Sequence, residues 1–417
     1  MGLTRNAYRR KFGEKKLAGI DSFRSVNFPV RVHAGPRALA NLSDEVDRLG
    51  AKRVFVVCGQ SVARFTSLLD TVSAALGERL AGVFDEAETG SPLPSVEKGV
   101  VQAAEAGADL ILAVGGGSAV VTTRAIIILL AENGSAHDLA TKYPAGQPPV
   151  SPRLMQPKIP NILVLTTPTT AATRAGTAVI APQSGHRLEL FDPKTRPSAI
   201  FWDSEAMLTA SPHLCISAAA SCYSGVIGGL QAPSQPNPLA HADLLQALHL
   251  MHENLPLVEA RPDDDSVRIN LAAAAFLYNR AGDSGATGGG FGVVSALAHS
   301  LDTRFKQCSH GAAYSILTAP GMRFNAEANA SGLARLASIM GVNRDSYDDH
   351  TAALAAADEV TGTFMNLGMP VRLTEVGVDE SGIKLIAQDA MTDYGLHRNV
   401  RPVENTSELE GLLNEVY

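Results

Sequence analysis

The sequence predicts an α/β fold in its first half and an all-α fold in its second half. Up to about residue 205, short apolar runs that are typical of buried strands alternate with a helical pattern. Beyond that point, segments rich in alanine and leucine have helical spacing and are separated by glycine or proline. Because alternating strands and helices form doubly wound, mostly parallel sheets, we expect an N-terminal arm at 1–26, an α/β domain at 27–205 and a helical domain at 206–417.

Each element rests on its own pattern. Four short apolar runs predict buried strands, namely RVFVVCG (53–59), DLILAVGGGS (109–118), NILVLTTPTT (161–170) and SAIFWD (198–203). Helical spacing predicts helices in PSVEKGVVQAAEAGA (94–108), HADLLQALHLMHENLPLVEA (241–260), SVRINLAAAAFLYNRAG (266–282), SGLARLASIMG (331–341) and HTAALAAADEVTGTFMNLG (350–368). The proline-rich stretch 142–161 and the glycine-rich stretch 282–292 are expected to be loops.

Composition excludes several classes of protein. The 417 residues are 45% hydrophobic and 18% charged, which fits a globular chain of two domains with a large core. The net charge of -7 argues against a nucleic-acid partner, and the apolar run AIIILLA (125–131) is too short to span a bilayer. The four cysteines show no C-x-x-C spacing, so we expect a reducing, cytoplasmic compartment. The basic N-terminal segment is either a solvated arm or a transit peptide.

A glycine-rich turn follows the second predicted strand. AVGGGS (113–118) precedes a helical pattern, where glycine lets the backbone approach a phosphate and the helix N-terminus attracts the anion. The turn alone is equally consistent with a tight strand-to-helix connection. TTPTT (166–170) ends another predicted strand, so we expect its hydroxyls at the same edge of the sheet. The residues predicted here to bind a dinucleotide are Gly115, Gly116, Gly117, Ser118, Thr166, Thr167, Thr169 and Thr170.

The end of the first predicted strand bears on the choice of dinucleotide. An acidic residue at this place would bind an adenosine ribose through its hydroxyls and would repel a 2′-phosphate. The chain has Gly59 there, with Arg64 nearby. We therefore predict that Gly59 lies in the cofactor site and that NADP is permitted as well as NAD. The alternative is that Arg64 is an ordinary surface arginine.

Several motifs occur in the order in which the iron-containing (group III) alcohol dehydrogenase family has them. The segments that resemble the family are FPVRVHAGPRALANL, DLILAVGGGSAVVTTRAI, TTPTTAATRAGTAVI, FDPKTRPSAIFWDSEAMLTASP, HGAAYSILTAPGMRFN and QDAMTDYGLHRNVRPV. The resemblance covers nearly the whole chain from about residue 27. It implies a dehydroquinate synthase-like fold, in which a dinucleotide-binding domain and a helical domain enclose a nicotinamide and usually Fe²⁺ or Zn²⁺. Maleylacetate reductases are members that work without a metal.

The resemblance also implies where metal ligands would lie. The family's ligands are an Asp and a His four residues apart on one helix, followed by two further histidines. The corresponding positions in this chain are Ser224, Gly228, Ser295 and His310. A serine hydroxyl is a poor ligand for a divalent transition metal and glycine has no side chain, so we expect no metal. A site rebuilt around His249 and His252 is the alternative, but these residues fall outside the family's metal-lining segments.

Without a metal, the oxygen of a reacting carbonyl needs a proton or hydrogen-bond donors. His299, which the resemblance places close to the nicotinamide, and His310 are the best candidates because imidazole titrates near neutral pH. Tyr223 and Ser295 are predicted to assist them.

Four arginines are further candidates for the site. Arg187, in the segment before the DP dipeptide, is predicted to contact the cofactor. Arg174 and Arg304 are predicted to bind a substrate carboxylate, because a guanidinium matches a carboxylate with two hydrogen bonds. Arg124 is a weaker candidate for the same role. The alternative for Arg174, Arg304 and Arg124 is a structural ion pair.

Together these features predict a metal-independent NAD(P)H-dependent reductase of a small carbonyl or oxo-acid, working as a homodimer with no nucleic-acid or membrane partner. One alternative is a non-redox enzyme on the same fold, a hydrolase, lyase or isomerase that uses His299 or His310 as general acid or base. A non-catalytic binding protein is a third hypothesis.

Overall fold

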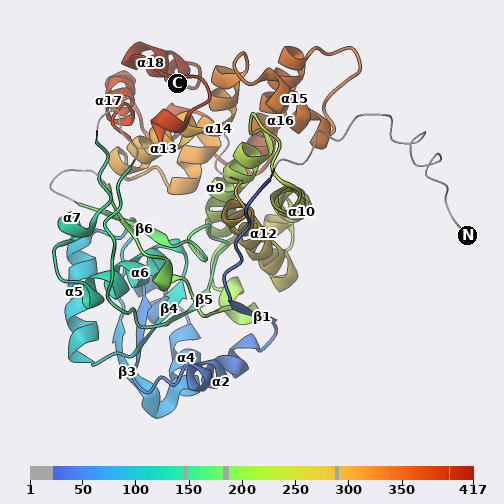
Figure 1. Cartoon of the computed structure of the whole chain (residues 1–417). Coiled ribbons are helices and arrows are strands. Elements are labelled where there is room, and N and C mark those ends of the chain that lie inside the picture. Colours follow the sequence, from blue (N-terminus) through green and yellow to red (C-terminus); the bar gives the residue numbers. More distant parts are fainter. Residues whose placement is uncertain (1–21, 145–148, 182–186, 287–290, 394) are drawn as a thin grey trace, which may run out of the picture.

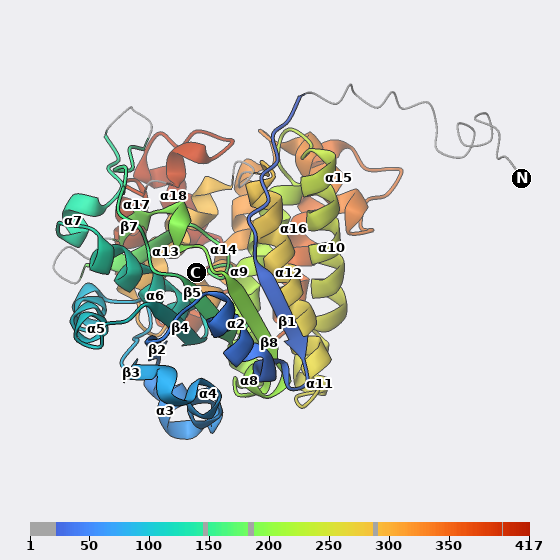
Figure 2. The same ribbon diagram turned by 60° about the horizontal axis from the view of Figure 1, so that its bottom comes forward.

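We analysed a computed structural model of the chain that describes residues 22–144, 149–181, 187–286, 291–393 and 395–417. Figures 1 and 2 show a sheet flanked by helices, in blue to green, joined to a mostly helical part in yellow-green to red. Most of the predicted arm at 1–26 lies outside the described residues.

The centre of the first part is a six-stranded, entirely parallel sheet. From one edge to the other it contains β1 (Arg31–Gly35), β8 (Ala199–Asp203), β5 (Asn161–Leu165), β4 (Leu110–Gly115), β2 (Val54–Cys58) and β3 (Leu80–Phe84). After β2 the chain first moves outward to β3 and then returns to form β4 on the other side of β2. This reversal creates a switch point between β2 and β4, where open parallel sheets usually bind ligands at the carboxyl ends of their strands.

Helices cover both faces of the sheet, and each face has its own apolar core. One face is covered by η1 (Ala38–Asn41), α2 (Leu42–Arg48), α3 (Gln60–Phe65) and α4 (Leu68–Leu76), which leads into η2 (Gly77–Arg79). The other is covered by α5 (Leu93–Glu105), α6 (Gly117–Ala131) and α7 (Ala136–Leu139). A separate antiparallel hairpin, β6 (Gly176–Ile180) and β7 (Arg187–Phe191), precedes η3 (Pro193–Thr195).

The second part consists of helices around the largest core cluster of the chain. They are α8 (Ser204–Leu208), α9 (Pro212–Leu230), α10 (Pro238–Asn254), α11 (Leu257–Ala260), α12 (Asp265–Asp283), α13 (Gly292–Arg304), α14 (His310–Asn325), α15 (Ala330–Ile339), α16 (Asp349–Asn366), η4 (Leu373–Val376), α17 (Glu380–Ala390), η5 (Leu396–Arg398) and α18 (Thr406–Asn414). Only α9, within the described residues, is long and apolar enough to cross a membrane, and 72% of its apolar window is buried inside the protein.

The predicted fold class is confirmed, since a parallel sheet between helices is followed by an all-helical part. All four predicted strands are present, as β2, β4, β5 and β8, and the helices predicted at 94–108, 266–282 and 350–368 are present as α5, α12 and α16. The prediction missed β1, β3, β6 and β7. β1 has no buried position, and most positions of β3, β6 and β7 are half-buried or exposed, so these strands lack the continuous apolar run that marks a central strand.

The two parts meet at the carboxyl ends of the central strands. Asn279 of α12 donates a hydrogen bond to the carbonyl of Thr170, just beyond β5, at 2.9 Å. The ring of Trp202 at the end of β8 packs edge-on against Phe276 of α12, at 6.0 Å between centroids. The loops that follow the strands therefore face the helical part.

Candidate functional site

The glycine-rich turn connects β4 to α6 and lies against the threonines that follow β5. A Cβ atom on Gly116 would lie 2.8 Å from Thr167 Oγ1, and one on Gly117 would lie 3.1 Å from Thr169 Oγ1. Gly115 has a φ of 146°, which a side chain would strain. α6 begins at Gly117 without a side-chain cap, so its first N–H groups remain for an anion.

The structure thus brings together two predicted halves of a pyrophosphate cradle. Bare backbone at the switch point faces threonine hydroxyls, and any side chain at Gly116 would fill the gap between them. Ser118 lies in the first turn of α6, and its carbonyl accepts a hydrogen bond from Ser91 at 3.2 Å. These residues fit the diphosphate of a dinucleotide, although Thr166 and Thr167 are themselves buried.

Gly59 follows β2 on the other side of the switch point. It precedes α3, and a Cβ atom there would lie 3.1 Å from the carbonyl oxygen of Ala87. Arg64 is exposed in the last turn of α3. The place where an acidic residue would contact an adenosine ribose is therefore occupied by glycine next to a solvent-exposed arginine.

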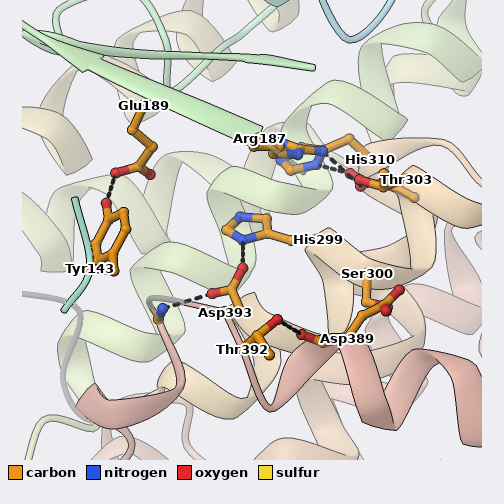
Figure 3. A network of polar contacts seen from close by, with 12 residues as sticks. Tyr143, Arg187, Glu189, His299, Ser300, Thr303, His310, Asp389, Thr392 and Asp393 are labelled. Carbon is orange, nitrogen blue, oxygen red and sulfur yellow. Dashed lines mark hydrogen bonds and ion pairs between the residues drawn. The ribbon is translucent and has the colours of Figure 1, made fainter. Parts of the chain in front are cut away.

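The two predicted catalytic histidines are each held by an aspartate (Figure 3). His299 Nδ1 in α13 lies 3.0 Å from Asp393 Oδ2, and His310 Nδ1 at the start of α14 lies 2.6 Å from Asp302 Oδ2. An ionised carboxylate can only accept, so Nδ1 is the protonated nitrogen in each pair. Asp393 also accepts a hydrogen bond from the backbone N–H of Gly395, at 2.7 Å.

Asp302 joins both parts of the protein. Its Oδ1 accepts a hydrogen bond from Arg187 Nη2 at 2.7 Å, and its side chain is only 6% exposed. Burial disfavours the charge on Asp302, but Arg187 and His310 outweigh it and lower the pKa of this carboxyl to about 2. Asp302 is therefore an anion at neutral pH. Arg187, which is predicted to contact the cofactor, forms an ion pair that joins β7 to α13.

Close helix packing fixes the backbone beside His310. A Cβ atom on Gly311 would lie 1.9 Å from the carbonyl oxygen of Ser217 in α9, so only glycine allows α14 to approach this closely. The His310 ring packs edge-on against Tyr314, one turn along, at 4.9 Å between centroids. Burial raises the pKa of Tyr314 to about 12, against the opposite effect of its hydrogen bond with Ser295. Ser295 is therefore linked to His310 through Tyr314, which contacts both residues.

The positions that correspond to the family's metal ligands contain a different arrangement. Ser224 is buried and accepts a hydrogen bond from Thr318 Oγ1 at 2.7 Å. A Cβ atom on Gly228 would lie 2.9 Å from the Phe291 ring, so this ring fills the space that a ligand side chain would enter. Within the described ranges, no three His, Cys, Asp or Glu side chains are grouped to hold an ion. The residues present do not fit the family's metal.

Other predicted residues lie elsewhere. Tyr223 is fully buried in the helical core, where its hydroxyl lies 3.1 Å from His252 Nε2, so the structure does not bring it to the catalytic histidines. Arg304 forms a two-pronged ion pair with Asp389, one bond being 2.8 Å. Arg124 is buried and donates to backbone carbonyls, among them that of Ala171 at 2.8 Å. Arg304 therefore forms a structural ion pair, which was the alternative to substrate binding, and Arg124 supports the backbone after β5.

Arg174 differs from the other predicted arginines. It lies after β5, is exposed, and pairs with no carboxylate in the part of the chain that the structure describes. Its Nε lies 3.4 Å from Asn279 Oδ1, and its guanidinium also hydrogen-bonds Tyr278 of the same helix. Burial raises the pKa of Tyr278, while Arg174 acts against that rise. A guanidinium with polar neighbours from α12 is suited to an incoming anion.

Sequence reasoning missed the residues that support the site. Asp302 lies eight residues before His310 in the same segment, so a carboxylate near two histidines was a visible signal. Asp393 lies 94 residues from His299, and nothing local in the sequence indicates that pair. The role of Phe291 was equally hidden, because it depends on helix packing.

Comparisons with known proteins cover almost the whole chain. Sequence models of "Iron-containing alcohol dehydrogenase" and of "Fe-containing alcohol dehydrogenase family, C-terminal" match residues 29–204 and 233–417. The NAD-dependent methanol dehydrogenase of Bacillus methanolicus is 26% identical over 372 residues, which are 88% of this chain and 93% of that protein. The lactaldehyde reductase of Escherichia coli K12 is 27% identical over 378 residues, 88% and 93% of the two chains.

Solved structures show the same fold at lower identity. A 1,3-propanediol oxidoreductase superposes with a TM-score of 0.83 at 22% identity, covering 95% of this chain and 100% of that one. The maleylacetate reductase of Agrobacterium tumefaciens has a TM-score of 0.73 at 21% identity, covering 95% and 98%. With both family models matched in order along the chain, the protein belongs to the iron-containing alcohol dehydrogenase family of oxidoreductases.

Proposed function

We propose that the protein is a metal-independent, NAD(P)H-dependent reductase of a small carbonyl substrate, with an oxo-acid as the favoured class. The observation that carries the metal-independent part is the Phe291 ring, which fills the space beside Gly228 where the family has a histidine ligand. Membership of an oxidoreductase family supports redox chemistry rather than hydrolysis or isomerisation. Curated relatives named as NAD-dependent methanol dehydrogenase and lactaldehyde reductase support nicotinamide as the cofactor.

The residues at the switch point fit the cofactor. Gly116, Gly117 and Thr169 would hold the diphosphate, with the N-terminus of α6 directed at its charge. When bound, a reduced nicotinamide supplies the hydride for the carbonyl carbon. Gly59 would lie beside the adenosine ribose and leave room for a 2′-phosphate.

The chain's own side chains would control the carbonyl oxygen and the substrate's charge. As negative charge develops on that oxygen, His310 in its imidazolium form would transfer the Nε2 proton to it and keep the Nδ1 proton in the hydrogen bond to Asp302. His299, when it is also protonated at Nε2, would add a second hydrogen bond. Arg174 would bind the carboxylate of an oxo-acid through two parallel hydrogen bonds. With these residues the carbonyl oxygen is stabilised by proton transfer and hydrogen bonding, without a metal ion as Lewis acid.

Cofactor titration and metal analysis test the proposal. Trp202 is the only tryptophan and lies at the carboxyl end of β8, so NADPH or NADH bound nearby should quench its fluorescence and accept its energy. We expect saturable binding of at least one of them below millimolar concentration. Purified protein should contain far less than stoichiometric iron or zinc, and chelator should leave reductase activity unchanged. Failure to bind either nucleotide would overturn the reductase proposal, and near-stoichiometric metal would overturn metal independence.

The Gly59→Asp substitution is expected to shift nucleotide preference. A carboxylate at this position would repel a 2′-phosphate, so the Kd for NADPH should rise about tenfold or more relative to the Kd for NADH, a change of about 1.4 kcal/mol. Both Kd values are measured by the same fluorescence titration. Gly59→Ala is the matched control, because it adds the same Cβ near Ala87 without a charge. An equal loss of both nucleotides in the two variants would contradict the assignment.

The Arg174→Gln substitution is expected to affect only charged substrates. Loss of a charge-assisted pair of hydrogen bonds should raise KM for an oxo-acid about 10–100-fold, corresponding to about 1.5–3 kcal/mol. KM for an aldehyde of similar size should change less than threefold. Arg304→Gln is the control, since that guanidinium is already paired with Asp389. Equal effects of Arg174→Gln on both substrates would argue against carboxylate binding at this residue.

A further inference from the structure

We infer that Asp302 is a positioning residue, which keeps a proton on His310 Nδ1 and aims Nε2 away from α13. Nε2 can then take up a proton from solvent, and the resulting imidazolium passes this proton to the substrate oxygen and returns to the Nδ1–H tautomer. The catalytic consequence rests on the proposed reductase function, whereas the tautomer does not. The starting observation is the 2.6 Å contact between His310 Nδ1 and Asp302 Oδ2.

The two carboxylate oxygens of Asp302 contact different residues. Oδ1 accepts from Arg187 at 2.7 Å and lies 3.4 Å from the Thr303 hydroxyl, while Oδ2 faces His310. A carboxylate with one oxygen fixed by a guanidinium cannot rotate away without breaking that ion pair. The second oxygen therefore stays aimed at Nδ1, and the imidazole is held in one orientation.

The side chains of Asp302 and His310 differ in their exposure to solvent. The Asp302 side chain is 6% exposed, whereas the His310 side chain is 47% exposed. Nδ1 and Nε2 lie on opposite sides of an imidazole ring, so a ring whose Nδ1 points to a buried carboxylate presents Nε2 outward. The edge-on contact with Tyr314 holds the ring plane.

Arg187 makes this arrangement depend on both parts of the protein. It comes from β7, whereas Asp302 and His310 come from α13 and α14. The proton donor is therefore correctly aimed only when the β6–β7 hairpin lies against α13. Arg187 and His310 both contact Asp302, and their side chains overlap in the view of Figure 3, above His299 and Asp393.

A purely structural ion pair is the competing explanation for Asp302. In that case its contact with Arg187 would be the important one, and His310 would behave alike with or without the carboxylate. Asp389 offers a matched control, because it forms an ion pair of the same kind with Arg304 and touches neither catalytic histidine.

The test uses the full chain labelled with ¹⁵N-histidine, in the wild type and in Asp302→Asn, with His310→Gln identifying the His310 signals. At a pH at which the His310 imidazole is uncharged, we expect its ¹⁵N signals in the wild type to be those of the Nδ1–H tautomer. Asp302→Asn should remove this preference and lower kcat for carbonyl reduction about 10²–10⁴-fold, with KM and the Kd for NADPH changed less than threefold. Asp389→Asn should leave the His310 signals and kcat as in the wild type.

The outcomes of this test distinguish the positioning role of Asp302 from the proposed reductase function. A wild-type His310 in the Nε2–H tautomer would overturn the inference without any variant, even if Asp302→Asn failed to fold. An unchanged kcat in a folded Asp302→Asn variant would also overturn it. If the wild type neither binds nicotinamide nor reduces carbonyls, but the tautomer still changes in Asp302→Asn, the proposed reductase function fails and the positioning role of Asp302 stands.

Discussion

His310→Gln is expected to lower kcat for carbonyl reduction about 10²–10⁴-fold, the usual contribution of a positioned proton donor. Glutamine can still hydrogen-bond but cannot transfer a proton, so the reacting oxygen loses its acid while substrate contacts at Arg174 remain. We therefore expect KM, the Kd for NADPH and the melting temperature to stay close to their wild-type values. Steady-state kinetics, fluorescence titration and thermal denaturation measure these four quantities.

The structure provides a direct control for this substitution. His350→Gln changes an exposed histidine near the start of α16, far along the chain from the site, and should leave kcat unaltered. His310 would have no chemical role if His310→Gln retained kcat within threefold of the wild type. If kcat and the melting temperature fell together, the loss would reflect packing of α14 against α9 instead.

Gly228→His is expected to have the largest effect on stability. Its first side-chain atom would lie 2.9 Å from the Phe291 ring, and an imidazole would need the volume that this ring occupies. Overpacking of this kind costs about 1–3 kcal/mol in free energy of unfolding. Chemical denaturation should show a lower midpoint with an unchanged slope. Gly362→His is the matched control, because a Cβ there, also in a helix, has nothing within 4 Å.

The same position tests whether packing, as well as the choice of side chains, would exclude a metal ion. Restoring the family's ligands by Ser224→Asp, Gly228→His and Ser295→His should not create a tight zinc site while Phe291 is present. Adding Phe291→Ala removes the ring, and zinc affinity should then rise measurably in a competition titration with a chromophoric chelator. Tight zinc binding by Gly228→His alone, with undiminished stability, would show that the ring does not exclude a ligand.

The central strands and the cofactor turn could be predicted from local sequence. β2, β4, β5 and β8 are buried on both faces, so each is a continuous apolar run. Their carboxyl ends must share one edge because the sheet is parallel, which brings Gly116 to Thr167. The edge strand β1 and the hairpin were missed, because they bury only part of their surface.

The histidine environment could be predicted only in part. His299 and His310 stood out by residue type, and Asp302 was visible in the same segment. The pairing of His299 with Asp393, and that of Arg187 with Asp302, join residues 94 and 115 positions apart. Sequence periodicity does not indicate such contacts, so the ion pair between Arg187 and Asp302 was not predicted.

The sequence by itself determined the fold class and the family resemblance, and it predicts that three of the family's ligand positions have no ligand side chain, because these results depend on local patterns and on which side chains are present. Only the tertiary structure shows which side chains fill the space at these positions and which residues hold His310. Helix packing places Phe291 against Gly228, and the meeting of β7 with α13 places Arg187 on Asp302. Both results depend on volume and charge contributed by distant segments, which become neighbours only when the chain folds.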